Sequence, residues 1–318
     1  YFLVSDALTF GGLLTAYGFT RHSAQDAWPI GEETFNSMPF LGHGYPLLYV
    51  ALMTFILIVS SVTMVLSVEA GHRMDKKGAI EDYSRSIELR PNDANAFINR
   101  GNLYYDLEDY NRAIEDFSKA IEINPNETFA YRKRGDAKYL LNDYQGVIDD
   151  YTKIIELNPE SSLGFYGRGS VKIEMDDLKG AIEDLTKSID IDFELKRAFF
   201  CRAYAKQELK EYKGAIEDYS KVLEKYPEDE MSLYNRGEAK TEINDYVGAI
   251  EDFTKLIEMY NKDETYYLKR GNAKDKLGDF KGAIEDFSKA IKLDPKSDEA
   301  YWRRGNSKKR IHDYSGAQ

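Results

Sequence analysis

The sequence predicts an all-α protein in two parts: two transmembrane helices, followed by an α-solenoid of stacked helix hairpins. Three observations predict this fold class. The pattern Ala113–Phe117 returns every 34 residues without an insertion. The 23 residues from Pro46 to Val68 carry no charged side chain. The composition then changes sharply near residue 73, after which charged residues are frequent.

The repeated pattern occurs in seven copies with one spacing. The copies begin at Ala79, Ala113, Val147, Ala181, Ala215, Ala249 and Ala283, and an eighth begins at Ala317. A fixed period of this length indicates stacked units, each too small to bury its own apolar face. The length of 318 residues is therefore a poor guide to the number of domains, because such an array grows by stacking.

Each unit is predicted to hold two helices. In the first complete unit they cover Ala94–Leu107 and Tyr110–Ile123, with a short turn at Asp109. Apolar residues of the second helix recur at i, i+1, i+4, i+7 and i+8, which gives it one apolar face. Asn124-Pro125 ends the unit, since proline cannot continue a helix.

Small residues recur at one place in every first helix. They are Gly101, Gly135, Gly169, Ala203, Gly237, Gly271 and Gly305. Glycine inside a helix costs about 1 kcal/mol relative to alanine, so this row indicates that two helices touch there. The matching small residues of the second helix are Ala113, Ala215, Ala249 and Ala283.

An arginine precedes each of these small residues. The set is Arg100, Arg134, Arg168, Arg202, Arg236, Arg270 and Arg304. Each unit also carries an acidic pair such as Glu115-Asp116. A charge that is identical in every unit favours a structural ladder of ion pairs between helices over a binding site.

The uncharged run Pro46–Val68 is long enough to cross a membrane. Its 23 residues make about 34 Å of helix, and a hydrocarbon core is about 30 Å thick. Phe2–Phe19 is a second, weaker span, apolar except for Asp6. Asp6 is either an intramembrane carboxylate that serves protons or ions, or an interfacial residue. A buried core helix is the alternative for Pro46–Val68.

Charges around the two spans predict their orientation. His72, Arg73, Lys76 and Lys77 follow the second span, whereas the 20–45 loop is mainly acidic. The positive-inside rule then places residue 73 onward in the cytoplasm. We expect a multi-pass protein of the bacterial inner membrane, with the array on the cytoplasmic side.

Five landmarks follow one another within residues 1–73: Phe2–Phe10, Trp28-Pro29, Pro39, Ser60–Thr63 and Glu69–Arg73. Their order and spacing resemble helices III and IV of cytochrome c oxidase subunit III. The resemblance implies a heme-copper respiratory oxidase, in which this subunit binds no metal, supports the catalytic subunit, holds lipid and influences proton uptake.

Two positions depart from that family. Asp6 stands where the family usually has a glutamate tied to proton handling, so the resemblance implies a proton-related role for Asp6. Leu66 and Ser67 stand where many relatives carry a histidine pair.

From Ala79 onward, the units are variants of one combination of an aromatic residue, Gly, Tyr, Ala, Phe, Ala and Pro within 34 residues, with Phe193 and Asn261 in place of the proline in two units. This combination resembles the tetratricopeptide repeat (TPR) family. The resemblance implies hairpins stacked into a right-handed superhelix whose inner groove binds peptide segments.

First-helix positions that vary between units and face such a groove would set its specificity. One set is Ile98, Arg132, Tyr166, Phe200, Tyr234, Leu268 and Trp302, and the other is Asn102, Asp136, Ser170, Tyr204, Glu238, Asn272 and Asn306. The first set is aromatic from Tyr166 to Tyr234, which favours an apolar or proline-rich ligand against the rings. Packing against the neighbouring helix is the alternative interpretation of these residues.

Four segments are expected along the chain. They are the membrane segment 1–73, a junction with an orphan second helix at 74–91, six complete units at 92–295 and a truncated seventh unit at 296–318. Lys77–Tyr83 is already repeat sequence, so the array enters halfway through a unit. A genuine fusion and an artificial join of two reading frames both explain this. The start at Tyr1 and the stop within a unit indicate a fragment of a longer protein.

Composition excludes several classes of function. The net charge of −12 argues against nucleic acid as a partner, because phosphates need a basic face. One cysteine, Cys201, and four histidines offer no metal-ligand spacing. The repeats show no Ser/His/Asp arrangement, Cys/His pair or glycine-rich phosphate loop. We expect no catalytic residue, cofactor or metal.

These observations favour a membrane-anchored interaction scaffold that binds peptide segments in its groove and associates with the respiratory chain. Two alternatives stay open. One is a non-catalytic, proton-related subunit III component of a heme-copper oxidase. The other is a soluble TPR adaptor artificially joined to a subunit III fragment. The expected partners are a protein or peptide ligand, heme-copper oxidase subunits and the lipid bilayer.

Overall fold

The computed structural model describes residues 37–38, 42–43, 75–192 and 196–315. The chain divides into two compact units, Tyr1–Leu89 and Arg90–Gln318. In the first unit, β1 (Ser37–Met38) and β2 (Gly42–His43) pair antiparallel, and residues 75–89 are helical.

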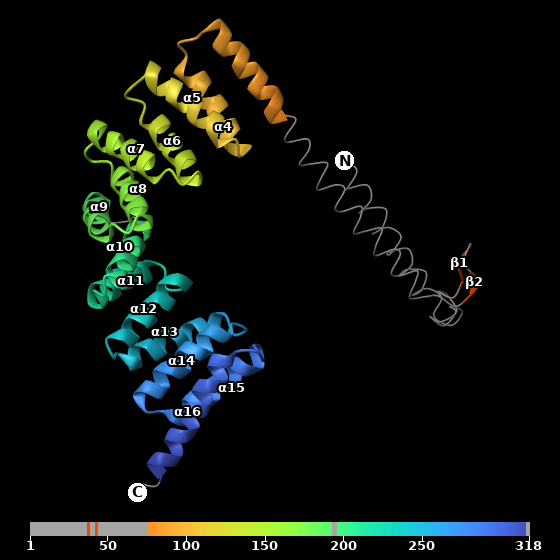
Figure 1. Cartoon of the computed structure of the whole chain (residues 1–318), viewed down its shortest axis with the longest axis vertical. Helices are drawn as coiled ribbons and strands as arrows, with labels where there is room; N and C mark the ends of the chain where they lie inside the picture. Colours follow the sequence, from red (N-terminus) through yellow and green to blue (C-terminus); the bar gives the residue numbers. More distant parts are fainter. Residues whose placement is uncertain (1–36, 39–41, 44–74, 193–195, 316–318) are drawn as a thin grey trace, which may run out of the picture. The chain divides into compact units, whose positions relative to one another are not determined.

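The second unit is a stack of helix hairpins (Figure 1). Its helices are α4 (Ala94–Asp106), α5 (Tyr110–Ile123), α6 (Thr128–Leu140), α7 (Tyr144–Leu157), α8 (Ser162–Glu174), α9 (Leu178–Ile191), α10 (Lys196–Glu208), α11 (Tyr212–Lys225), α12 (Glu230–Glu242), α13 (Tyr246–Met259), α14 (Glu264–Leu277), α15 (Phe280–Leu293) and α16 (Asp298–Ser315). Even-numbered helices are the first helices of the repeat units and odd-numbered ones are the second helices. The predicted α-solenoid is confirmed.

A short turn with an aspartate cap starts most second helices. The Asp177 carboxylate accepts the backbone N–H of Gly180 at 3.0 Å, and Asp143, Asp245 and Asp279 accept equivalent bonds from glycines. An aspartate in this place satisfies one of the first N–H groups of the helix, which have no partner within it. The repeated Asp therefore fixes where each second helix begins.

The core lies between the two helices of each hairpin. Phe117 of α5 is fully buried, and a Cβ added to Gly101 of α4 would lie 2.9 Å from its ring. The nearest neighbour of Gly101 is thus the large residue of the second helix, while a Cβ added to Gly169 would also lie 3.2 Å from the backbone oxygen of Ala181, the small residue. A larger side chain in place of Gly101 would occupy the volume that the Phe117 ring fills.

The recurring arginines pair with the aspartate sixteen residues later. Arg168 of α8 donates from Nε and Nη2 to Asp184 of α9 at 2.8 and 2.7 Å, and Lys172 reaches the same carboxylate at 2.8 Å. The equivalent pairs are Arg100–Asp116, Arg134–Asp150, Arg202–Asp218, Arg236–Asp252 and Arg270–Asp286. In each of these six pairs the second acidic residue is the buried aspartate, and the residue before it, a glutamate or in one unit Asp149, is exposed.

The third nitrogen of five of these arginines, from Arg134 to Arg270, reaches the preceding unit. Arg168 Nη1 donates to Thr152 Oγ1 of α7 at 3.1 Å. The same bond joins Arg134 to Ser118, Arg202 to Thr186, Arg236 to Ser220, Arg270 to Thr254 and Arg304 to Ser288. One guanidinium group thereby connects three consecutive helices.

The predicted pair of transmembrane helices is wrong as a description of this fold. No helix in the described part of the chain is long and apolar enough to cross a membrane. Crossing takes about 20 consecutive apolar residues. Helix α5, in contrast, has 14 residues and a charged face opposite its buried one. The runs Phe2–Phe19 and Pro46–Val68, from which the spans were predicted, lie outside the described residues.

The predicted location in a bacterial inner membrane, with a cytoplasmic array, is wrong for the same reason. The predicted location depended on two apolar helices that could cross a bilayer. Each helix of the array carries charged residues, which are costly inside a membrane. Asp6, the predicted intramembrane carboxylate, also lies outside the described residues.

Candidate binding groove

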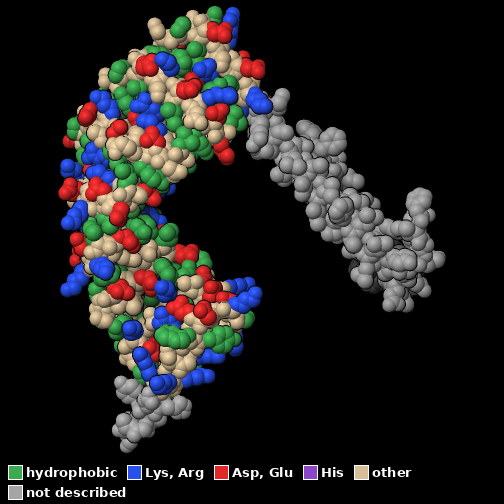
Figure 2. Space-filling view, in the orientation of Figure 1, with side chains coloured by type: hydrophobic (Ala, Val, Ile, Leu, Met, Phe, Trp, Pro, Cys, Tyr) green, Lys and Arg blue, Asp and Glu red, His purple; other side chains and the backbone are tan. Residues whose placement is uncertain are grey.

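First helices line the inner face of the array. Four pairs of consecutive first helices pack on one another: α4 with α6, α8 with α10, α10 with α12, and α14 with α16. Among the closely packed pairs of the described array, no two consecutive second helices occur. Successive units are therefore closer together on the side of the first helices. On this side Figure 2 shows hydrophobic side chains with acidic ones among them.

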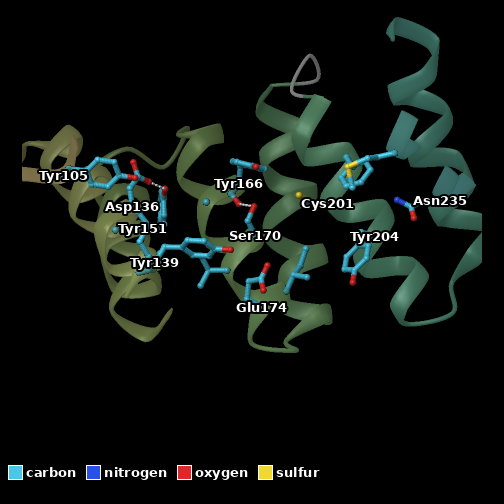
Figure 3. A pocket seen from close by; sticks show the side chains of 18 residues that line it. Tyr105, Asp136, Tyr139, Tyr151, Tyr166, Ser170, Glu174, Cys201, Tyr204 and Asn235 are labelled. Atoms are coloured by element: carbon cyan, nitrogen blue, oxygen red, sulfur yellow. Dashed lines mark hydrogen bonds between the residues drawn. The ribbon is translucent and has the colours of Figure 1, made fainter. Parts of the chain in front are cut away.

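A cavity of about 570 Å3 lies along five consecutive first helices, α4, α6, α8, α10 and α12 (Figure 3). Its lining is Tyr105, Gly135, Asp136, Tyr139, Leu140, Tyr166, Gly167, Ser170, Val171, Ile173, Glu174, Phe200, Cys201, Tyr204, Met231 and Asn235, with Val147 and Tyr151 from α7. The surface is aromatic and apolar with a few carboxylates, a composition typical of ligand pockets.

The cavity brings together five of the residues predicted to face a groove. Tyr166, Phe200 and Tyr204 line it with Asp136 and Ser170. The Ser170 hydroxyl donates to the backbone oxygen of Tyr166 at 2.8 Å, so it is engaged within its own helix. The Phe200 ring also packs edge-on against Tyr219, with ring centres 5.7 Å apart.

Other predicted residues pack within the array. Ile98 is buried, and Leu268 joins a core cluster. Tyr234 packs against Phe253 and Tyr266, with ring centres 6.2 Å apart in both cases. These three side chains make packing contacts inside the array.

The remaining predicted residues lie outside the cavity lining. Arg132 pairs with Asp136 at 3.5 Å, Glu238 pairs with Lys269 at 2.6 Å, and Asn272 accepts from Arg303 at 2.7 Å. Trp302 and Asn306 are in α16, where the Trp302 side chain is 67% exposed. Asn102 is in α4 and its side-chain oxygen is buried.

Sequence reasoning missed Tyr105, Tyr139, Ile173 and Glu174. The first three lie seven residues after the positions of the first predicted set, two helical turns further along the same face. Extending the predicted sets by this period would have found them. Gly167 had its own signal, since the other units carry Asn, Lys, Cys or Arg in its place.

The pKa values of several hydroxyl groups and of the thiol in the cavity are raised, so these groups are neutral at pH 7. Burial, and then the charge of Glu174, raise the pKa of the Tyr139 hydroxyl. Burial and Asp136 raise the pKa of Tyr151, and burial raises the pKa of the Cys201 thiol. No group of His, Cys, Asp and Glu among the described residues has an arrangement that could hold a metal ion. This surface is equipped for binding by rings, hydroxyl groups and negative charge.

Family models of known repeats match three parts of the chain. A model described as tetratricopeptide repeat matches residues 94–127, and another with that description matches 202–264. A model described as TPR repeat matches residues 77–108 and 276–310. The chain carries tetratricopeptide repeats. No curated protein matches the chain in a sequence search.

Solved structures of TPR proteins have the same fold as the array. A MamA protein is 23% identical, with a TM-score of 0.51 over 53% of this chain and 92% of its own. A TPR protein of Parabacteroides merdae is 17% identical, with a TM-score of 0.52 over 73% of this chain and 92% of its own. PilF of Pseudomonas aeruginosa is 16% identical, with a TM-score of 0.55 over 67% of this chain and 97% of its own. At these identities the likeness concerns the fold.

The matching family models begin at residue 77. Nothing in these comparisons supports the resemblance of residues 1–73 to cytochrome c oxidase subunit III. Oxidase subunits and lipid as partners have no support either.

Proposed function

We propose that the chain is a protein–protein interaction scaffold, and that its TPR groove from α4 to α12 binds an extended segment of a partner protein. The proposal rests on the aromatic cavity shared by five first helices. A cavity that extends over five helices suits an extended chain, whose side chains would enter one after another.

The lining fits peptide recognition in its chemistry. Tyr166, Phe200 and Tyr204 offer flat apolar area and hydroxyl groups on side chains with few rotatable bonds. Such side chains lose little conformational entropy when a ligand covers them. The ligand must be found by experiment, because the similar structures indicate the fold and not what this groove binds.

A peptide library tests the groove directly. A phage-displayed library of random 12-residue peptides is panned against the full chain, and the enriched peptides are synthesised for affinity measurement. We expect Tyr204→Ala to weaken binding about tenfold, because a large aromatic anchor of an interface is lost. Tyr226→Ala is the matched control, since Tyr226 is 40% exposed and Tyr204 is 38% exposed, and Tyr226 lies outside the cavity.

Two outcomes would contradict the proposal. One is the absence of enriched peptides. The other is a set of peptides whose affinity falls equally with both variants, which would place the binding surface elsewhere on the array.

A further inference from the structure

The second repeat unit differs from its neighbours at the small position of its first helix. In four other units a Cβ added to this glycine would lie 2.8 or 2.9 Å from the large residue of the second helix. These contacts are Gly101 with Phe117, Gly169 with Leu185, Gly237 with Phe253 and Gly271 with Phe287. At Gly135 the nearest atom is Tyr151 Cε2, 3.6 Å away. The ring of Tyr151 is therefore withdrawn from Gly135.

Gly167 of the next unit explains where the ring lies. A Cβ added to Gly167 would be 2.3 Å from two ring atoms of Tyr151, closer than any real contact. The ring thus occupies the volume that a side chain at position 167 would take. The Tyr151 hydroxyl donates to Asp136 at 3.3 Å, which holds the ring in this position.

Withdrawal of the ring leaves an apolar slot between α6 and α8. Gly135, Val147 and Val171 line the cavity here, and all three are buried. Val147 and Tyr151 are the cavity's two lining residues from a second helix, so the cavity reaches through the layer of first helices at this point. Buried apolar walls without polar groups suit one aliphatic side chain.

One carboxylate, Glu174, lines the cavity at the end of α8, and the next two first helices end in a glutamate as well. Glu174, Glu208 and Glu242 end α8, α10 and α12, and all three are exposed. The lysines two residues before them are engaged with the buried aspartates Asp184, Asp218 and Asp252. Among the residues that the structure describes, no ion pair reaches these three glutamates, so this border of the groove is negative.

In the described part of the chain, no cation near the cavity forms an ion pair with Glu174; Lys133 Nζ lies 5.3 Å from the centre of the Tyr105 ring. Arg132 is paired with Asp136 at 3.5 Å. Arg197 is near Tyr166 and Cys201, but it is the second residue of α10, and Glu208 is the last. Eleven residues of helix separate these two positions, which is about 16 Å.

We infer that the slot between α6 and α8 takes one aliphatic side chain of a peptide that carries Lys or Arg beside that residue, where the cation meets Glu174. The inference rests on the proposed function, since it names the class of segment that the groove binds. An acidic segment would place like charges against the glutamate border, which disfavours it. A small apolar molecule would fill the slot without any dependence on Glu174.

Variants of the slot and of its border test the inference on the full chain, with the synthetic 12-residue peptides enriched from the library. Gly135→Ala places a methyl group in the slot with ordinary contacts of 3.6 to 3.8 Å, so the fold accepts it. We expect affinity to fall about fivefold or more. Gly167→Ala should act similarly, by pushing the Tyr151 ring back over Gly135. Gly305→Ala is the control, because its added Cβ meets nothing within 4 Å.

Charge is tested in the same assay. The enriched peptides should share an aliphatic residue next to Lys or Arg. Changing that cation to Gln, or Glu174→Gln in the protein, should each weaken binding about threefold, as an exposed ion pair does. The two changes together should weaken peptide binding no more than one change alone. Glu183→Gln is the control, since Glu183 is an exposed residue of a second helix.

Failure of the inference is distinguishable from failure of the proposed function. Peptides that depend on Tyr204 but are acidic, or that ignore Gly135→Ala and Glu174→Gln, would overturn the inference and leave the groove function standing. An apolar dye that binds the slot independently of Glu174 and does not compete with the enriched peptides would also overturn it, because the peptides would then bind elsewhere. Absence of Tyr204-dependent peptides would overturn both.

Discussion

The carboxylate of Asp184 is buried, with 4% of its side chain exposed. Burial alone would raise its pKa, but the hydrogen bonds from Arg168 and Lys172 outweigh burial and hold the pKa below its usual value. Because the folded pKa is lower than the unfolded one, the ionised group stabilises the fold above about pH 4. That stabilisation is lost as the pH falls through the lower, folded pKa.

Asp184→Asn should therefore destabilise the array at pH 7 by about 3 kcal/mol, because Arg168 and Lys172 lose a buried anionic partner. Urea unfolding followed by circular dichroism measures the loss at pH 7 and at the lowest pH where the chain stays folded. The loss should shrink at the lower pH, because the stabilisation from the ionised wild-type carboxylate falls as the pH approaches the folded pKa. Glu183→Gln should change stability by less than about 0.5 kcal/mol. A loss independent of pH would contradict this account.

The sequence predicted the arginine-to-carboxylate pairs from their recurrence, but it did not distinguish the two acids of each pair. Sixteen residues separate Arg100 from Asp116, and the turn of the hairpin decides that Asp116 and not Glu115 faces inward. The position of the Tyr151 ring was beyond such reasoning. It depends on Gly167, which belongs to the next unit, and on the hydroxyl contact with Asp136.

The turn between the two helices of a unit has one residue in the left-handed region. These residues are Glu108, Asn142, Asp176, Lys210, Asn244 and Gly278, with φ between 60° and 93°. Asn, Asp and Gly tolerate this conformation, whereas for most other residues it costs roughly 1–2 kcal/mol. Lys210 and Glu108 therefore carry backbone strain that Gly278 does not.

Lys210→Gly should stabilise the array by about 0.5–1 kcal/mol, because relief of the left-handed conformation exceeds the added entropy of the unfolded chain. The urea midpoint of the full chain measures the change. Glu217→Gly is a control of opposite sign, since Glu217 is an exposed residue inside α11, where glycine costs about 1 kcal/mol. If both variants destabilise, the turn does not store this strain.

At the scale of the whole molecule, the 34-residue period predicted the stacked hairpins because every unit repeats the same local packing. The period said nothing of which first-helix side chains would meet a ligand. Tyr234 and Tyr166 occupy equivalent positions in their units. Tyr234 packs against Tyr266 of the next unit, whereas Tyr166 lines the cavity. The charge-free run Pro46–Val68 indicated compatibility with lipid, which is a property of composition and does not establish a spanning helix.

Contacts in the described array are short in range. Each closely packed pair of helices is adjacent along the chain or two helices apart. Stability is then a sum of unit and neighbour contributions, and a local defect stays local. Phe253 of α13 and Phe117 of α5 are both fully buried and lie eight helices apart along the chain, so they offer a matched pair.

Phe253→Ala should cost about 3–5 kcal/mol, through lost burial and the cavity left beside Gly237. Hydrogen exchange measured by mass spectrometry should show faster exchange in α12 to α14, while α4 to α6 keep their protection. Phe117→Ala should give the reverse pattern, with α12 to α14 protected, because neither ring touches the other's neighbours. Faster exchange throughout the array in either variant would mean that the stack unfolds as one cooperative unit, and the sum of neighbour contributions would have to be abandoned.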